Sequence, residues 1–154
     1  MWQGTVAFLH FATEAGAPMI DVEQLTLVAG KGIEGDRYML GNGFYSRRPE
    51  QGRQATLFEL ETLVALQRDL HIELRPEEHR RNITTRGVPL NHLVGRRFRV
   101  GEVLLEATRL SVPCKHVEQT SGKAVFNALV NRAGLNTRIL QGGVIRAGDV
   151  IRPE

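Results

Sequence analysis

Hydrophobic and polar residues alternate in several short runs of the chain, which is typical of half-buried strands. Tight-turn pairs such as Gly101-Glu102 and Gly142-Gly143 separate neighbouring runs. We predict strands at residues 5–9, 22–29, 98–100, 103–110, 137–141 and 144–145, with a last one at Val150-Ile151. Because the connections are short, neighbouring strands are expected to pair antiparallel.

Helical spacing of apolar residues is clearest between positions 55 and 70. Thr56 and Glu59 have the spacing of a capping box at its start. A short second helix is predicted at Pro76, because proline suits a first helical turn. A third is predicted over residues 123–133, with Gly134 as its stop. The apolar stripe of the first helix consists of Leu57, Leu60, Leu63, Val64 and Leu66.

Short strands, turns and two or three helices together indicate one α+β domain over residues 1–154. Its sheet is expected to be mainly antiparallel and barrel-like. Strands and helices do not alternate regularly enough for a doubly wound fold. Residues 39–54 are rich in glycine and arginine and lack periodicity, so we expect a long, mobile surface loop there.

The composition is that of an ordinary globular protein. The chain has 154 residues, of which 42% are hydrophobic and 24% charged, so it can bury a core without cross-links. Its single cysteine cannot form an internal disulfide, which favours a reducing compartment. No signal-peptide pattern or membrane-spanning apolar run is present. We therefore expect a cytoplasmic protein that does not associate with membranes.

Arginine is concentrated in two parts of the chain, although the net charge is only +3. Arginine suits bidentate binding of phosphate or carboxylate. Aromatic residues make up 6% and do not interleave with the arginines. A small phosphorylated ligand therefore fits better than a nucleic acid, and a solvated surface is the simpler alternative. The two groups are Arg80, Arg81, Arg86, Arg96, Arg97 and Arg99, and Arg47, Arg48 and Arg53.

The candidate reactive group is Cys114, which follows Pro113 at the end of an apolar run. Neighbouring cations favour the thiolate form of a cysteine, and Lys115 and His116 come directly after it. A thiolate is both a nucleophile and a ligand for soft metals. His116 could shuttle a proton, or could simply lie at the surface or cap a helix. The alternative for Cys114 is a buried structural role.

Two further segments supply polar groups that could bind a ligand. Asp36 and Arg37 lie in a glycine-framed loop, where they could shape a pocket or merely fix the turn. No second cysteine or histidine cluster completes a metal site, so a metal would arrive with most of its ligands. Asn82 could bind a ligand or fix its own loop, because an amide satisfies several partners. The donors available for a phosphate are Arg81, Asn82, Thr84, Thr85 and Arg86.

Five stretches, in sequence order from about Gly32 to Asp149, resemble the MOSC domain. This domain occurs at the C-terminus of molybdenum cofactor sulfurases and in stand-alone bacterial proteins, and the chain resembles the stand-alone type. The stretches are Gly35-Asp36-Arg37-Tyr38, residues 81–85, residues 93–101, Pro113-Cys114-Lys115-His116 and residues 142–149.

The resemblance implies a barrel of the MOSC type, similar to the pyruvate-kinase β-barrel, that binds molybdenum cofactor. It implies that Cys114 ligates molybdenum or carries sulfur, and that Asp36, Arg37 and the segment from Arg81 to Arg86 help to hold the pterin. Family members reduce N-hydroxylated compounds or deliver sulfur or cofactor, and a redox or sulfur-donor protein is an implied partner. No pyridoxal-phosphate domain is expected in this chain.

Both an oxidoreductase and a sulfur-transfer protein fit this pattern. The alternative function is a non-catalytic binding module, in which the barrel holds a phosphorylated ligand or a protein partner and Cys114 is structural. The sequence does not indicate an oligomeric state.

Overall fold

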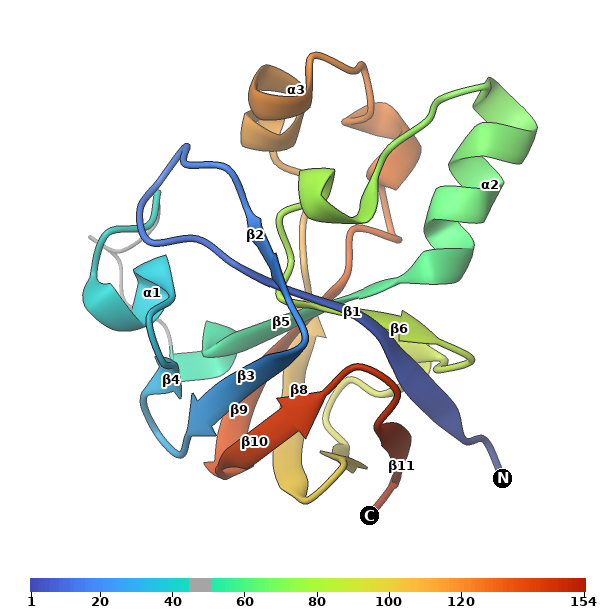
Figure 1. The fold of residues 1–154 in the computed structure, drawn as a ribbon. Coiled ribbons are helices and arrows are strands. Elements are labelled where there is room, and N and C mark those ends of the chain that lie inside the picture. Colours follow the sequence, from blue (N-terminus) through green and yellow to red (C-terminus); the bar gives the residue numbers. More distant parts are fainter. Residues whose placement is uncertain (45–50) are drawn as a thin grey trace.

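A closed barrel dominates the computed structural model, which describes residues 1–44 and 51–154 (Figure 1). Within those residues seven strands form it: β1 (Gly4–Phe11), β5 (Ala55–Glu59), β6 (Ile83–Arg86), β7 (Arg97–Val100), β8 (Val103–Leu110), β9 (Leu135–Gln141) and β11 (Val150–Pro153). Their order is β11, β7, β8, β9, β5, β6, β1, and β11 also pairs with β1. Only the β5–β6 pair among these is parallel. The predicted α+β fold with a mainly antiparallel, barrel-like sheet is confirmed.

A smaller antiparallel sheet contacts the barrel. It contains β10 (Gly143–Arg146), β3 (Gln24–Val28) and β4 (Gly32–Ile33), while β2 (Ile20–Val22) pairs with β1 instead. The single strand predicted at residues 22–29 is therefore wrong in its first part. Strand β2 pairs with β1, whereas β3 pairs with β10, so the chain passes from one sheet to the other at Glu23.

Three α-helices lie outside the barrel within the described residues: α1 (Arg37–Leu40), α2 (Leu60–Leu70) and α3 (Lys115–Ser121). Short 3-10 turns are η1 (Gln51–Arg53), η2 (Pro76–Glu78), η3 (Leu90–His92) and η4 (Asn127–Leu129). Figure 1 shows α2 and α3 at one end of the barrel, with the two labelled chain ends at the other. No helix in the described part of the chain is both long and apolar enough to cross a bilayer.

Strand β5 separates two apolar cores. Leu57 points into the barrel, whereas Phe58 points into a second cluster with Leu66 and Val117 beneath the helices. Successive strand residues face opposite sides, so a strand buried on both faces carries a continuous apolar run. β5 thus joins the barrel to the helical layer that holds α3.

The predicted helix at residues 55–70 is correct only from Leu60 onward. Its first five positions form β5, and the proposed capping box is wrong. Thr56 does not cap a helix, because it lies buried opposite Asn82, whose Oδ1 accepts hydrogen bonds from Thr56 N and Oγ1 at 3.2 and 3.0 Å. A short buried run cannot be assigned to helix or strand from periodicity alone.

The helix predicted at residues 123–133 is also wrong. Helix α3 begins earlier, at Lys115, and ends at Ser121, capped by Gly122, whose φ of 73° suits a glycine. Only the 3-10 turn η4 lies in the predicted range. Gly134 is needed for space, since a Cβ there would lie 2.3 Å from the Leu57 oxygen. The predicted loop at residues 39–54 includes the end of α1 and all of η1, and its residues 45–50 lie outside the described part.

Asn82 holds three parts of the fold together. Its Nδ2 donates to His10 O at 3.2 Å and to Asp36 Oδ1 at 3.4 Å, while its Oδ1 accepts from Thr56. We predict that Asn82→Ala lowers the free energy of unfolding by about 2–4 kcal/mol, because buried polar groups lose their partners. Urea unfolding monitored by circular dichroism measures this change. A loss below about 0.5 kcal/mol would contradict it.

Candidate functional site

Cys114 lies in the wall of a cavity of about 160 Å³ near the end of the barrel that carries α3. The wall combines one thiol with cationic and hydroxyl or amide side chains from several elements. Its lining residues are Tyr38, Arg53, Thr56, Arg81, Arg109, Ser111, Val112, Cys114 and Asn136. Long-range packing of the barrel therefore brings together groups that are far apart in sequence.

The sulfur of Cys114 occupies the N-cap of α3. Pro113 leads into an extended residue, with φ −128° and ψ 131° at Cys114, and the helix begins immediately after it. The Sγ atom accepts a hydrogen bond from His116 N at 3.3 Å, and the residue is only half-buried. This cap fixes the direction of the sulfur while leaving it accessible from the cavity.

The His116 ring is turned toward Phe44. The two rings stack with centroids 3.6 Å apart and planes within 4°, and His116 Nδ1 lies 3.3 Å from Gln119 Oε1. Lys115 is exposed. The catalytic role predicted for His116 stays a prediction.

Arg81 lines the same cavity and connects its walls. Its Nε donates to Ala133 O at 3.1 Å and its Nη2 donates to Val112 O at 3.3 Å. The guanidinium thereby ties the segment before Cys114 to the segment before β9. Of the predicted site residues that are described, Arg81 and Cys114 are the two in the cavity wall.

Arg80 was not selected as a site residue from the sequence, yet it is the most unusual cation near Cys114. The side chain is buried, and Nη1 donates to Ala17 O at 2.8 Å. Nη2 is buried without a hydrogen-bond partner in the described residues, and φ is 65°. Burial and the nearby Arg37 charge lower the pKa of Arg80, whereas Tyr38, Asp36 and, least of the three, the thiolate form of Cys114 raise it. The protein therefore buries a positive charge with an unused donor within electrostatic reach of the sulfur.

Two more residues of the cavity wall were missed by sequence reasoning. Ser111 Oγ donates to Asn136 Oδ1 at 2.6 Å, and both side chains are buried. Ser111 directly follows β8 and Asn136 lies in β9, and these two strands are neighbours in the barrel. In sequence they look like ordinary strand-end polar residues, and only the pairing of β8 with β9 shows that they share a wall with Cys114.

Asp36 and Arg37 are interior residues, exposed by only 1% and 4%. Asp36 Oδ1 accepts from Ala12 N at 3.2 Å and from Arg37 Nη1 at 3.1 Å. Arg37 Nη2 donates to the Arg80 carbonyl at 3.1 Å. Neither residue lines the Cys114 cavity. They support the Arg80 backbone, and direct contact with a cofactor stays a prediction for both.

The remaining predicted residues follow the geometry of β6. Thr84 and Thr85 are fully buried, so their hydroxyl groups bond within the protein. Arg86 is exposed and pairs with Thr5 at the far end of the strand. Five residues at about 3.3 Å each place it roughly 16 Å from Arg81. The structure thus does not bring Arg81 and Arg86 together in one cavity.

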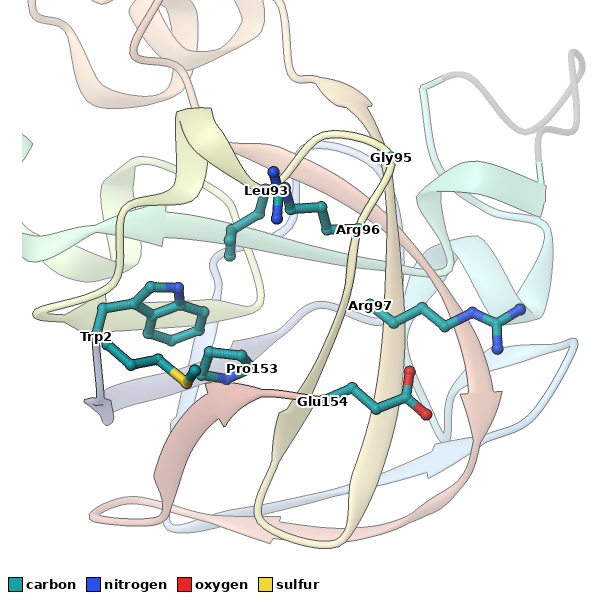
Figure 2. Close-up of a pocket in the computed structure, with 8 residues that line it drawn as sticks. Trp2, Leu93, Gly95, Arg96, Arg97, Pro153 and Glu154 are labelled. Atoms are coloured by element: carbon teal, nitrogen blue, oxygen red, sulfur yellow. The ribbon is translucent and has the colours of Figure 1, made fainter.

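A second cavity of about 600 Å³ lies beside the chain ends. Trp2 and Pro153 lie on one side of it, while Arg97 and Glu154 extend on the other (Figure 2). Its lining has no cysteine or histidine among the described residues. None of the predicted site residues lies there, so the thiol chemistry belongs to the smaller cavity.

Two buried histidines lie close to the Arg80–Arg81 segment. His10 and His79 are each 1% exposed, and burial lowers the pKa of both, that of His79 strongly. A lowered folded-state pKa means that the unfolded chain binds the proton first as pH falls. The free energy of unfolding is therefore independent of the protonation of these histidines above about pH 6.5. It falls as the pH drops below that value, with a slope of up to about 1.4 kcal/mol per pH unit for each histidine.

We expect His79→Asn to remove one histidine's share of this pH dependence. Urea unfolding at several pH values between 5 and 7.5 measures the slope. The matched control is His71→Asn, because His71 is exposed at the end of α2 in a left-handed conformation that asparagine tolerates. Equal slopes for wild type and His79→Asn would contradict the prediction.

The comparisons with known proteins agree with this geometry. The MOSC domain family matches residues 35–152. This match covers most of the chain, including Cys114 and most of the barrel. The chain therefore belongs to the MOSC domain family. No curated protein matches it significantly.

Solved structures of low sequence identity share the fold. The YuaD protein from Bacillus subtilis superposes with a TM-score of 0.79 at 17% identity, covering 98% of this chain and 97% of that one. YiiM from Geobacillus stearothermophilus gives 0.73 at 13% identity, covering 98% and 75%. YiiM from Escherichia coli gives 0.69 at 18% identity, covering 100% and 70%.

Proposed function

We propose that this protein binds molybdenum cofactor in the cytoplasm, and that Cys114 is the protein ligand to molybdenum or the carrier of a sulfur atom. The observation that carries the proposal is the placement of a half-buried, accessible thiol in a cavity wall with Arg81. A thiolate prefers thiophilic centres, and guanidinium groups prefer oxyanions. The MOSC family match supports the same cofactor.

The donor set fits a cofactor that brings its own metal ligands. No cluster of three or more histidine, cysteine or acidic side chains is placed to hold a metal ion within the described residues. Cys114 would therefore provide one bond, and the cofactor the others. Arg80 does not line this cavity, but its buried Nη2 is a donor without a partner in the described residues.

The cavity volume limits how the cofactor can sit. At about 160 Å³ it is smaller than the roughly 300–1,000 Å³ of typical ligand pockets. It can receive the end of the ligand that faces Cys114, and the remainder of the pterin would extend beyond it. Ser111 and Asn136 would contact the enclosed end, because their buried polar groups form the wall.

When bound, the cofactor would supply the two-electron chemistry that reduces N-hydroxylated compounds. The protein's contribution is to hold and orient it. Cys114 is fixed by its N-cap hydrogen bond from the His116 backbone, and Arg81 holds the two cavity walls together. The proposed proton-holding role of the His116 ring would require it to leave its stack on Phe44. A redox or sulfur-donor protein would complete the cycle.

Metal ligation and sulfur transfer by Cys114 are distinguished by mass. A sulfur carrier purified without reductant should show intact protein heavier by one sulfur atom, and reduction should remove the addition. A metal ligand should show no such addition while molybdenum co-purifies. If the purified protein contained no molybdenum and carried no added sulfur, the result would favour the non-catalytic binding module.

We predict that Arg81→Ala lowers cofactor affinity by about fivefold, because loss of its bonds to residues 112 and 133 loosens the wall beside Cys114. Arg86→Ala should stay within about twofold of wild type, since it lies at the far end of β6. Pterin fluorescence after release from purified protein measures both. Equal losses in the two variants would show that the cavity is not the binding site.

A further inference from the structure

His79 is a buried imidazole with a specific partner on every side. Its ring stacks on Phe58 with centroids 4.3 Å apart, and the edge of His10 lies against it at 6.3 Å. Nε2 lies 2.8 Å from Thr84 Oγ1, and Nδ1 accepts a hydrogen bond from Arg81 N at 2.9 Å. The residue comes directly before Arg80 and Arg81, of which Arg81 lines the Cys114 cavity.

The Arg81 contact determines the tautomer of His79. A backbone N–H can only donate, so Nδ1 must be unprotonated, and the ring proton resides on Nε2, where it is donated to Thr84. Because the imidazole is buried and stacked, it cannot turn over without displacing Phe58.

This hydrogen bond closes a tight turn over residues 79–81. Arg80, in the middle, has φ 65°, a conformation that an arginine adopts only when its surroundings enforce it. The turn sends the Arg80 side chain toward Ala17 and the Arg81 side chain toward Val112 and Ala133. Without an acceptor at Nδ1, the Arg81 amide would be left without this partner and the turn would lose its closure.

We propose that His79 is a positioning residue for the Cys114 site, where its unprotonated Nδ1 holds Arg80 and Arg81 in the backbone conformation that directs the Arg81 guanidinium to the wall of the Cys114 cavity and the Arg80 guanidinium to Ala17. This role in cofactor binding depends on the proposed function. Its geometry can be tested without any cofactor, because the charge around Cys114 is a property of the protein alone.

A pair of variants separates the acceptor from the ring. His79→Asn keeps an acceptor oxygen at the position of Nδ1 but loses the stacked ring. His79→Phe keeps the ring on Phe58 but has no acceptor. If Nδ1 positions the arginines, His79→Asn should resemble wild type at the site and His79→Phe should not.

The readout is the ratio of alkylation rates of Cys114 by iodoacetate, which is anionic, and iodoacetamide, which is neutral. The thiolate fraction cancels in this ratio, so the ratio reports the cationic field around the sulfur. We expect this rate ratio to fall several-fold in His79→Phe and in Arg80→Gln. It should stay close to the wild-type value in His79→Asn and in the exposed-site control His71→Asn. A purely structural role for His79 would change stability in both variants without separating their ratios.

The nitrogen spectrum of His79 in the wild-type protein provides a test that does not depend on any variant folding. At neutral pH we expect a neutral ring with its proton on Nε2. A proton on Nδ1, or a ratio in His79→Phe equal to wild type, would overturn the positioning role. Absence of molybdenum from the wild-type protein would overturn the proposed function instead, leaving this result intact.

Discussion

Replacing Cys114 by serine should lower the affinity for molybdenum cofactor by about a hundredfold or more. Loss of groups that merely orient a metal ligand already costs about 10- to 100-fold, so loss of the ligand itself should cost at least as much. Serine oxygen is a hard donor and a poor substitute for a thiolate at a thiophilic centre. Molybdenum per chain, measured after gel filtration of protein from cofactor-producing cells, reports the change.

The same substitution should leave the fold intact. Cys114 caps α3 through His116 N, and serine is a better N-cap residue than cysteine. The free energy of unfolding of Cys114→Ser should therefore stay within about 1 kcal/mol of wild type. A variant that retains molybdenum, or that loses it only because it unfolds, would contradict the role given to Cys114.

Arg80→Gln should lower cofactor affinity by about thirtyfold. Arg80 does not line the Cys114 cavity, so this loss requires that the buried Nη2 becomes the donor to an oxyanion of the cofactor, a charge-assisted hydrogen bond that contributes about 2 kcal/mol. At the same time the variant should not be less stable by more than about 0.5 kcal/mol. It loses the bond to Ala17 O but no longer buries a charge next to Arg37.

The matched control for Arg80→Gln is Arg152→Gln. It makes the same change of charge at an exposed position of β11. Cofactor affinity should be unchanged in the control, and added salt should weaken cofactor binding equally in wild type and control. If Arg80→Gln kept full affinity and lost about 2 kcal/mol of stability, Arg80 would be a structural residue.

The strand pattern and turn pairs were enough to predict a barrel-like antiparallel sheet, because most strands have one buried face. β5 was taken for a helix because both of its faces are buried, so Leu57 and Phe58 serve different cores. β6 was missed because Thr84 and Thr85 are polar residues that occupy fully buried positions. Helix α3 has little apolar periodicity, since Val117 is its one buried residue.

The sequence makes Cys114 the candidate reactive group because it is the single cysteine and follows a proline, and the structure places it half-buried in a cavity wall. Arg80 was not identified from sequence, because sequence gives no reason to separate it from Arg81. Their different contacts come from the turn closed by His79, which is a tertiary feature involving Phe58 and Thr84. The sequence also predicts Asp36 and Asn82 as ligand-binding residues. In the structure both side chains are buried and hydrogen-bond within the protein, Asp36 to Ala12 and Asn82 to Asp36.

The most direct measurement is the content of molybdenum and pterin in the wild-type protein, determined on the same sample purified from cells that make the cofactor. The account predicts both in equal amounts, approaching one of each per chain, and neither from cells that cannot make the cofactor. Wild-type protein that contains neither molybdenum nor pterin, although folded and with Cys114 reduced, would contradict it.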